Sequence, residues 1–490
     1  MNPIKITRTD AQFSPNPNRV ITKPYLPGDE IFPDGHSRIQ HVVDRILAMA
    51  DESVAATLES VHRRFDGRHH DLNAALEASC RIIAERITNS DLLSPEQRLL
   101  VGAYFTHEYS IESAALSNPS IVPHPDQTGL NPGDTRFVMS LRAIGEGHIS
   151  SIEFRAGVIN SKSEIVVDSP AKQASSPSRR SPLYDKHAFT TKLSELGALN
   201  ELAALVLDLL PDRFTMEHLE TGLADSDLHH DRWPTGAQTA RTIHWLASSN
   251  YETTFGEDSA LSDRVIFPEG PTESNGMEDA RFVRFTHDDQ TVTYFATYTA
   301  FDGFKVLPQL IETSDFLSFR ISTLNGERAE NKGMALFPRM IDGRYAALSR
   351  NDNENNYIML SDHVRYWNET EKIQVPDRPW ELMQIGNCGS PLETEAGWLV
   401  ITHGVGPMRQ YSLGAILLDL DDPWQVIGHL KEPLLTPNDD ERDGYVPNVV
   451  YSCGSMIHGD QLVLPYGFSD VATRIALVPL HDLLGQLTQK

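Results

Sequence analysis

Two adjacent acidic residues, Glu278 and Asp279, are the residues of this sequence that could most directly do acid–base chemistry. Gly276 precedes them and Arg281 follows them, so a guanidinium lies close to both carboxyl groups along the chain. Gly276 permits a backbone turn that side chains would crowd. A carboxyl group beside a cation at such a turn can donate a proton in a cleavage reaction, or can form an ordinary surface ion pair. These four residues alone do not separate the two interpretations.

Two strands are predicted directly after the acidic pair. Residues 282–285 and 292–299 are rich in apolar and β-branched side chains, and a polar turn separates them. In an extended chain, Glu278 and Asp279 would point to opposite sides, whereas Asp279 and Arg281 would share one side. We therefore expect the acidic pair where a loop enters a β-hairpin, with Arg281 beside the Asp279 carboxylate.

The sequence around this pair resembles glycoside hydrolase family 130. The pattern Gly-x-Glu-Asp-x-Arg precedes a strand, and the next strand ends in Ala-Thr-Tyr-Thr-Ala at 296–300. The resemblance implies a mainly β fold, a five-bladed β-propeller, and the activity of a β-mannoside phosphorylase or a β-mannosidase. It also implies that Asp279 is the catalytic acid. Ala280 stands where the family usually has Pro, and the resemblance runs from about Asn118 to the C-terminus with one long interruption.

The resemblance implies a substrate site built from residues spread along the rest of the chain. Asn118 and Arg142 match the pattern of the family's first blade, and Lys332 lies in a segment that relatives direct at the sugar. Tyr466 and Asp470 belong to a closing motif whose Asp contacts the mannosyl group. The residues implied for substrate binding are Asn118, Arg142, Glu278, Arg281, Lys332, Tyr466 and Asp470.

A second set of residues is implied for phosphate. Many relatives have His-Arg where this chain has Ser349 and Arg350, so only Arg350 carries over. His403 would add a donor that strengthens when it is protonated. A lone His in an apolar strand is more often a core residue, and a lone Arg is usually solvated, so the interpretation rests on the joint order of these residues. The residues implied for phosphate binding are Arg142, Arg350, His403, Arg409 and Tyr411.

The basic residues favour phosphorolysis over hydrolysis. Inverting hydrolysis normally uses two carboxylates about 6.5–9.5 Å apart, one as acid and one as base. A phosphorylase needs only the acid, because inorganic phosphate is the nucleophile and cations hold it. We expect an inverting β-mannoside phosphorylase that makes mannose 1-phosphate, with phosphate as co-substrate and no cofactor or metal.

Two alternatives stay open. A β-mannosidase could use Glu441 or Asp443 as a base or as a sugar contact, and a non-catalytic propeller could only bind glycans. Asp279 argues against the binding protein, because binding alone does not require a proton donor. Asp302 and Lys305 are weaker site candidates.

The pattern of apolar residues divides the chain. Residues 1–35 look like an extended arm, and 36–116 are predicted to be helical, with Ser94 and Pro95 starting a helix that runs towards Leu116. Residues 117–490 are expected to be the propeller. A helical insertion at about 185–230 carries a leucine stripe that needs a partner, and we expect it to dock on the N-terminal helices. From Gln238 onward the chain is predicted to be β-rich.

The amino-acid composition limits the possible architecture, partners and location of the protein. A chain of 490 residues is too long for one ordinary core unless that core is a closed repeat such as a propeller. The net charge of −26, from 68 acidic and 42 basic residues, disfavours nucleic acid and anionic membranes as partners. The three cysteines, Cys80, Cys388 and Cys453, are expected to be free buried thiols. We expect a cytoplasmic protein, and a homo-oligomer stays open.

Overall fold

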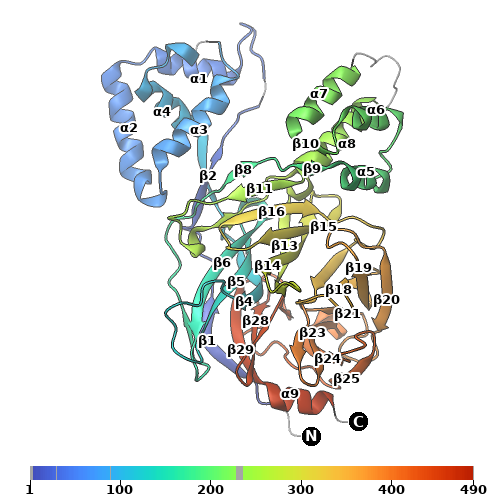
Figure 1. Ribbon diagram of the computed structural model, residues 1–490. Coiled ribbons are helices and arrows are strands. Elements are labelled where there is room, and N and C mark those ends of the chain that lie inside the picture. The colour runs from blue at the N-terminus through green and yellow to red at the C-terminus, as the bar shows by residue number, and fades with distance from the viewer. Residues whose placement is uncertain (1–3, 29, 89, 228–235, 489–490) are drawn as a thin grey trace.

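The computed structural model describes residues 4–28, 30–88, 90–227 and 236–488. A mainly β body carries two helical lobes on the same side, and the two termini lie near one another on the opposite side (Figure 1). The expectation of a mainly β chain with an N-terminal helical region and a helical insertion is confirmed.

The first sheet of the body contains the segment around Asp279. It has 11 strands among the described residues, in the order β4-β5-β6-β13-β14-β15-β16-β11-β8, and β7 and β12 also pair with β6. A single parallel pair, Gly276 opposite Ser150, joins the run that ends at β6 to the run that begins at β13. The strands are β4 (Ala115–Pro123), β5 (Thr135–Ile144), β6 (Ser150–Ile159), β7 (Ile165–Val167), β8 (Ser178–Arg180), β11 (Tyr251–Thr254), β12 (Val265–Ile266), β13 (Gly276–Thr286), β14 (Val292–Phe301), β15 (Val306–Thr313) and β16 (Ser318–Thr323).

Three further antiparallel sheets follow along the chain. Each is a run of neighbouring strands whose inner members are almost wholly buried, as expected where both faces of a strand are packed. The second sheet has β17 (Lys332–Leu336), β18 (Tyr345–Arg350), β19 (Asn356–Ser361) and β20 (Glu369–Gln374). The third has β21 (Gln384–Asn387), β22 (Leu392–Thr394), β23 (Gly397–Val405), β24 (Tyr411–Leu418) and β25 (Val426–His429). The fourth has β26 (Val450–Tyr451), β27 (Met456–His458), β28 (Gln461–Phe468) and β29 (Ala472–Pro479), and helix α9 (Leu480–Leu487) follows it.

The N-terminal segment is extended as predicted, but it is part of the body. Strand β1 (Thr7–Phe13) pairs antiparallel with β29, so the first described strand completes the last sheet. Arg8 on β1 donates through Nε to Glu441 Oε1 at 3.1 Å, and this carboxylate is fully buried. The beginning and the end of the chain are thereby fixed to each other.

The N-terminal helical lobe is an insertion in a hairpin. Strand β2 (Val20–Pro24) pairs with β3 (Thr106–Ser110), with Pro24 opposite Thr106, and four helices lie between them. They are α1 (Arg38–Leu47), α2 (Asp51–Phe65), α3 (Leu72–Ala84) and α4 (Pro95–Tyr104). Ser94 caps α4 in a capping box with Gln97, as its position before Pro95 predicts. The expectation that this helix runs towards Leu116 is wrong, because α4 ends at Tyr104 and strand β3 follows.

The helical insertion also differs from its prediction in extent. It contains α5 (Lys186–Glu195), α6 (Glu201–Leu209), α7 (Met216–Asp227) and α8 (Gly236–Ser248), with β9 (Tyr184–Asp185) paired to β10 (Arg213–Phe214). Helix α8 occupies a stretch that we expected to be β-rich from Gln238. The prediction is wrong here because a short run of apolar residues does not distinguish a buried helix from a strand. The end of the predicted insertion, 228–230, lies outside the described residues.

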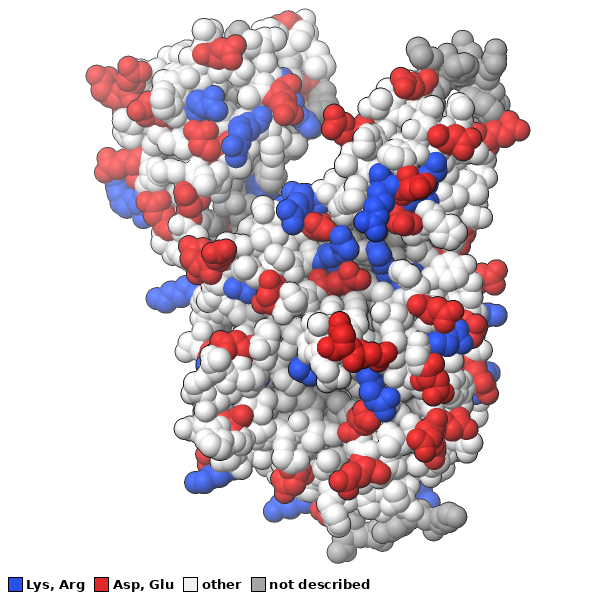
Figure 2. Space-filling model, in the orientation of Figure 1, with Lys and Arg blue, Asp and Glu red and all other residues white. Residues whose placement is uncertain are grey.

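The two helical lobes do not pack on each other. The N-terminal lobe buries a cluster around Val43, Ile83 and Leu100, and the insertion buries its own around Leu193 and Ile243. Neither cluster contains a residue of the other lobe, and open space separates the two in Figure 2. The expected docking is therefore wrong, because part of the leucine stripe is buried within the core of the insertion itself, whereas Leu199 and Leu205 are exposed.

The expectation about the cysteines can be compared with the structure. Cys80, Cys388 and Cys453 are free and buried, as predicted. None of the described helices is both long enough and apolar enough to cross a membrane.

Candidate active site

A bulge in strand β13 sets the positions of the two acidic residues. The pairing with β14 shifts between Glu278 and Arg281, and Asp279 has a left-handed φ of 57°. Gly276, at φ 135°, packs so closely that a Cβ atom would lie 2.5 Å from Ser150 Oγ. The predicted alternation of side chains is therefore wrong at this point, because the extra residue turns both carboxylates towards the same side.

One guanidinium contacts both carboxylates. Arg142 on β5 donates through Nη2 to Glu278 Oε1 at 2.6 Å, and its Nη1 lies 3.8 Å from Asp279 Oδ1. Glu278 also accepts from Lys332 Nζ at 2.6 Å, so this carboxylate orients two cations from different strands. Both oxygens of Glu278 therefore accept from cations, so this carboxylate is not free to act as a base.

Asp279 is held by β4 as well as by the cations. Asn118, in an irregular part of β4 and at φ 50°, donates from Nδ2 to Asp279 Oδ1 at 2.6 Å. Burial by itself would raise the pKa of the Asp279 carboxyl, but the charges of Arg142, Lys332 and Arg281, with the Asn118 hydrogen bond, outweigh it and hold the pKa below its ordinary value. Without a bound anion, Asp279 is therefore ionised at neutral pH.

Arg281 lies deeper than expected. Its guanidinium, which we expected to pair with Asp279, donates instead to the backbone oxygen of Asn387 at 2.8 Å and to Tyr451 Oη at 2.9 Å. Its residual exposure is only 3%. Arg281 therefore supports the floor of the site, and Asn387 and Tyr451 are neighbours that the sequence did not single out.

His403 and Arg350 lie together, as the resemblance implies. Arg350 Nη1 lies 3.1 Å from His403 Nε2. A guanidinium only donates, so Nε2 is the acceptor and the ring proton is on Nδ1, which faces Cys388 Sγ at 3.7 Å. Burial, together with the charges of Arg350 and Arg281, holds the pKa of His403 well below its ordinary value. The expected protonated donor is therefore wrong: neutral His403 positions Arg350.

Tyr411 and Arg409 extend this group towards the surface. The ring of Tyr411 is stacked against His403 with the ring centroids 6.1 Å apart, and the Arg409 guanidinium lies 5.7 Å from the centre of the Tyr411 ring. Asp470, at φ 49°, lies close enough to be affected by the charges of Arg142, Asp279 and Arg409. Burial raises the pKa of Asp470 against the opposing effect of Arg142.

The other candidates lie elsewhere or are already occupied. Tyr466 is fully buried and donates to Glu441 Oε1 at 2.6 Å, so its predicted contact with the sugar is wrong. Glu441 also pairs with Arg8 and Arg474, which excludes it as a base. Asp302 and Lys305 form the turn between β14 and β15, where Asp302 Oδ1 accepts from the Lys305 backbone nitrogen at 2.6 Å. Asp443 is exposed in a loop.

Two buried donors at the site lack a partner. Among the described residues, no hydrogen-bond partner is found for Nε of Arg142 or Nε of Arg350. A buried donor without an acceptor costs about 1–3 kcal/mol of folding free energy, unless water or a ligand accepts its hydrogen bond. These two atoms belong to two of the three guanidiniums that the resemblance assigns to phosphate, the third being Arg409.

One cluster in the described part of the chain has metal-ligating side chains in reach of one another. Asp34, His36 and His41 offer ligand atoms that all lie within 4.8 Å. They lie at the start of the N-terminal lobe, whereas the strands that carry Asp279 belong to the body. Asp34 and His41 already share a hydrogen bond of 2.8 Å at the surface.

The fold and the site thus define a mainly β protein with a half-buried acid, Asp279, that is affected by the charges of Arg142, Lys332 and Arg281. A family profile described as beta-1,4-mannooligosaccharide phosphorylase matches residues 246–489. A 1,2-beta-oligomannan phosphorylase from Thermoanaerobacter sp. (strain X514) is 32% identical over 230 residues, which are 46% of this chain and 75% of the relative. A beta-1,2-mannobiose phosphorylase from the same organism is 35% identical over 227 residues, covering 44% of this chain and 70% of the relative.

The chain belongs to glycoside hydrolase family 130, and the resemblance seen in the sequence is confirmed. The solved beta-1,2-mannobiose phosphorylase from Listeria innocua, in complex with beta-1,2-mannobiose, is 21% identical with a TM-score of 0.45, over 77% of this chain and 93% of that one. The profile match contains Asp279, Lys332, Arg350 and His403, whereas Asn118 and Arg142 precede it.

Proposed function

We propose that this protein is an inverting β-mannoside phosphorylase that uses inorganic phosphate to release mannose 1-phosphate. The observation that carries the proposal is the arrangement around Asp279: this acid lies beside Arg142 and Lys332, and further cations are Arg350 at the end of β18, in contact with His403, and Arg409 in the turn between β23 and β24. The names of the two Thermoanaerobacter relatives, both phosphorylases, support it.

In the proposed reaction, Asp279 donates the proton and the cations bind the phosphate. Asp279 gives its proton to the glycosidic oxygen as the bond from that oxygen to the anomeric carbon breaks. A phosphate oxygen attacks the same carbon from the opposite face, so a β-mannoside yields the α-configured phosphate. Guanidiniums suit the phosphate because they form two parallel hydrogen bonds to it. Glu278 and His403 act as positioning residues, because each holds a guanidinium by a direct contact.

Hydrolysis is the weaker alternative. Inverting hydrolysis needs a second carboxylate that is ionised, so that it can activate water. Glu441 is buried in pairs with Arg8 and Arg474, and Glu278 is held by two cations. Asp470 is a remaining carboxylate that is affected by the charges of Arg142 and Asp279, so the preference for phosphorolysis rests on the cations that accompany Asp279.

We also infer a five-bladed β-propeller from residue 115 to the end of β29, with the two helical lobes outside it. Five successive antiparallel runs support this: two within the 11-stranded sheet, at β4–β7 and β13–β16, and one in each later sheet. The pairing of β1 with β29 would close such a ring, because it joins the N-terminal strand to the last run. Loops from all blades would then meet at Asp279.

Replacing Arg350 tests the phosphate assignment. Arg350→Ala should raise the Michaelis constant for phosphate much more than that for the mannoside, because one charge-assisted pair to the anion is lost. Arg344→Ala, directly before the same strand, is the matched control, since Arg344 pairs with exposed Asp362 and Glu369. Equal effects of Arg350→Ala on both Michaelis constants would remove Arg350 from the phosphate site.

A further inference from the structure

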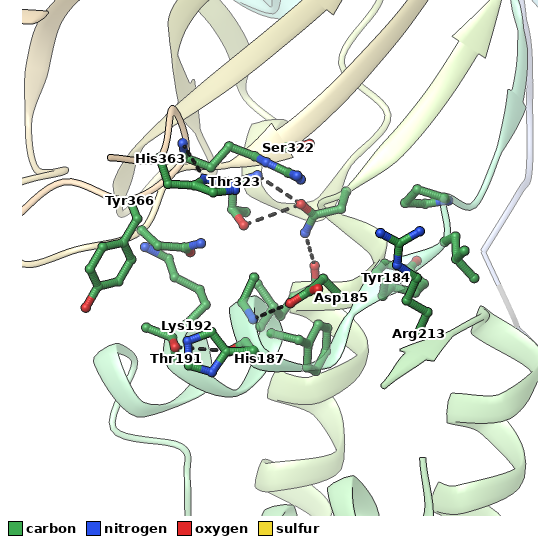
Figure 3. Close-up of a pocket in the computed structure, with 18 of the residues that line it drawn as sticks. Tyr184, Asp185, His187, Thr191, Lys192, Arg213, Ser322, Thr323, His363 and Tyr366 are labelled. Atoms are coloured by element: carbon green, nitrogen blue, oxygen red, sulfur yellow. Dashed lines mark hydrogen bonds between the residues drawn. The ribbon is translucent and has the colours of Figure 1, made fainter. Parts of the chain in front are cut away.

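A cavity lies where the helical insertion meets the body. It has a volume of about 630 Å³, which is in the range of small-molecule sites. Figure 3 shows Lys192 and His187 of α5 on one side, and His363 and Tyr366, from the loop after β19, across from them. No residue that lines it belongs to the site around Asp279.

The cavity is preformed because α5 is fixed to the body at its edge. Lys192 is buried and donates through Nζ to the backbone oxygen of Leu324 at 2.7 Å. Glu195, one turn further along α5, accepts from the backbone nitrogen of Gly326 at 2.6 Å. These two hydrogen bonds hold the insertion against the segment after β16, so the space between them is a fixed feature of the fold.

The lining is rich in cations although the whole chain is strongly acidic. Lys192, Arg213, Arg320 and Arg365 line the cavity, and Asp185 is the only carboxylate among its lining residues. Figure 2 shows blue side chains gathered at this junction of the insertion and the body. Such a concentration on a chain of net charge −26 favours an anionic ligand.

Two of these guanidiniums are available for a ligand. Lys192 already pairs with Glu195 at 3.0 Å, and Arg320 pairs with Glu252 at 2.9 Å. No ion pair to another described residue is found for Arg213 or Arg365. Two unpaired guanidiniums facing one cavity are the donors that suit a phosphate group.

The remaining lining suits a hydroxylated molecule. Tyr366 is 40% exposed and offers an aromatic face at the rim, with His363 next to it. Ser322 and Thr323 line the side formed by β16. An aromatic face with hydroxyl groups nearby matches a sugar, which has both C–H faces and hydroxyl groups.

We propose that this cavity is a second binding site, for a sugar phosphate. Arg213 and Arg365 would hold the phosphate group, and Tyr366 with the polar residues of β16 would hold the sugar. The choice of mannose 1-phosphate as the first probe rests on the proposed function, whereas the inference that the cavity takes an anionic ligand does not. A ligand here would bridge the insertion and the body.

Hydrogen–deuterium exchange of the full chain with mannose 1-phosphate tests this site separately from the catalytic one. We expect protection of residues 183–192 and 363–366, and protection of 276–282 reports the catalytic site in the same experiment. Arg213→Ala/Arg365→Ala should weaken binding at the cavity at least about tenfold while leaving turnover unchanged. Arg64→Ala, an exposed guanidinium on the other lobe, is the control and should keep the protection.

The outcomes are distinct. Protection of 183–192 and 363–366 that the double variant abolishes supports the proposal, even if the catalytic segment shows no response. Protection of 276–282 alone at saturating ligand overturns it, and so does cavity protection that the double variant leaves unchanged. Equal protection by inorganic phosphate at the same concentration overturns the sugar part of the assignment.

Discussion

At the scale of single residues, the backbone irregularity at Asp279 decides which groups meet. The left-handed φ of 57° brings Glu278 and Asp279 to the same guanidinium, whereas a regular strand would separate them. A non-glycine residue in this conformation costs of order 1–3 kcal/mol and persists where the surroundings enforce it. Asn118, at φ 50°, is the residue that donates to the Asp279 carboxylate, so two strained residues face each other at the proposed acid.

Removing the proton donor tests the role of Asp279. Asp279→Asn should keep the fold and lower turnover on a natural mannoside by roughly 10²–10⁴-fold, towards the upper end because a sugar is a poor leaving group. The loss should be much smaller on a 4-nitrophenyl mannoside, whose leaving group needs no proton. Asp443→Asn, which alters an exposed carboxylate, is the control. Near-normal turnover of Asp279→Asn on the natural substrate would exclude Asp279 as the acid.

The pKa of Asp279 gives a second prediction. Without ligand the pKa lies below its ordinary value, so the group is ionised at neutral pH. A bound phosphate dianion occupies the same cations and adds a repelling charge, which raises this pKa. Binding at about pH 8, where free phosphate is already a dianion, should therefore take up as much as about one proton per site at Asp279.

Calorimetry of phosphate binding in buffers of different ionisation enthalpy measures that uptake. The slope of the binding enthalpy against the buffer enthalpy gives the number of protons. Asp279→Asn should bind phosphate with no uptake. An uptake that persists in Asp279→Asn would assign the proton to another group.

At the scale of elements, the sequence predicted the features that depend on local chemistry. Ser94 before Pro95 marks the start of α4, where the Ser94 side chain accepts from the Gln97 nitrogen at 3.2 Å. The helix end at Tyr104 was missed because the next strand, β3, exists only through its pairing with distant β2. The bulge at Asp279 was missed for the same reason, since register is set by the partner strand.

The hairpin that carries the N-terminal lobe leads to a prediction for this element. Pro24 lies opposite Thr106, so replacing 25–105 by Asn-Gly would close β2 and β3 as a two-residue hairpin. The lobe has its own core, and its polar contacts with the body include Gln173 Nε2 to the His69 oxygen at 3.0 Å and His70 to Asp263 at 3.5 Å. We expect the shortened chain to fold and to keep its phosphorolytic rate, as measured by circular dichroism and product release. Loss of activity in a folded variant would show that the lobe contributes to the site.

At the scale of the whole molecule, charge is distributed unevenly. The chain carries a net charge of −26, and acidic side chains dominate much of the face in Figure 2. A phosphate dianion is repelled by such a field unless convergent donors outweigh it locally. The combination of Arg142, Lys332 and Arg350 is therefore informative as a group, although each of these residues alone would be unremarkable on a surface.

The most direct test of the central claim is the dependence of the reaction on phosphate. The protein is incubated with β-mannobioses of each linkage, with and without inorganic phosphate, and the products are identified by nuclear magnetic resonance. We predict that cleavage requires phosphate and yields mannose 1-phosphate with the α configuration, since attack occurs opposite the leaving group. Cleavage at the same rate without phosphate, with free mannose as the product, would contradict phosphorolysis and establish a β-mannosidase.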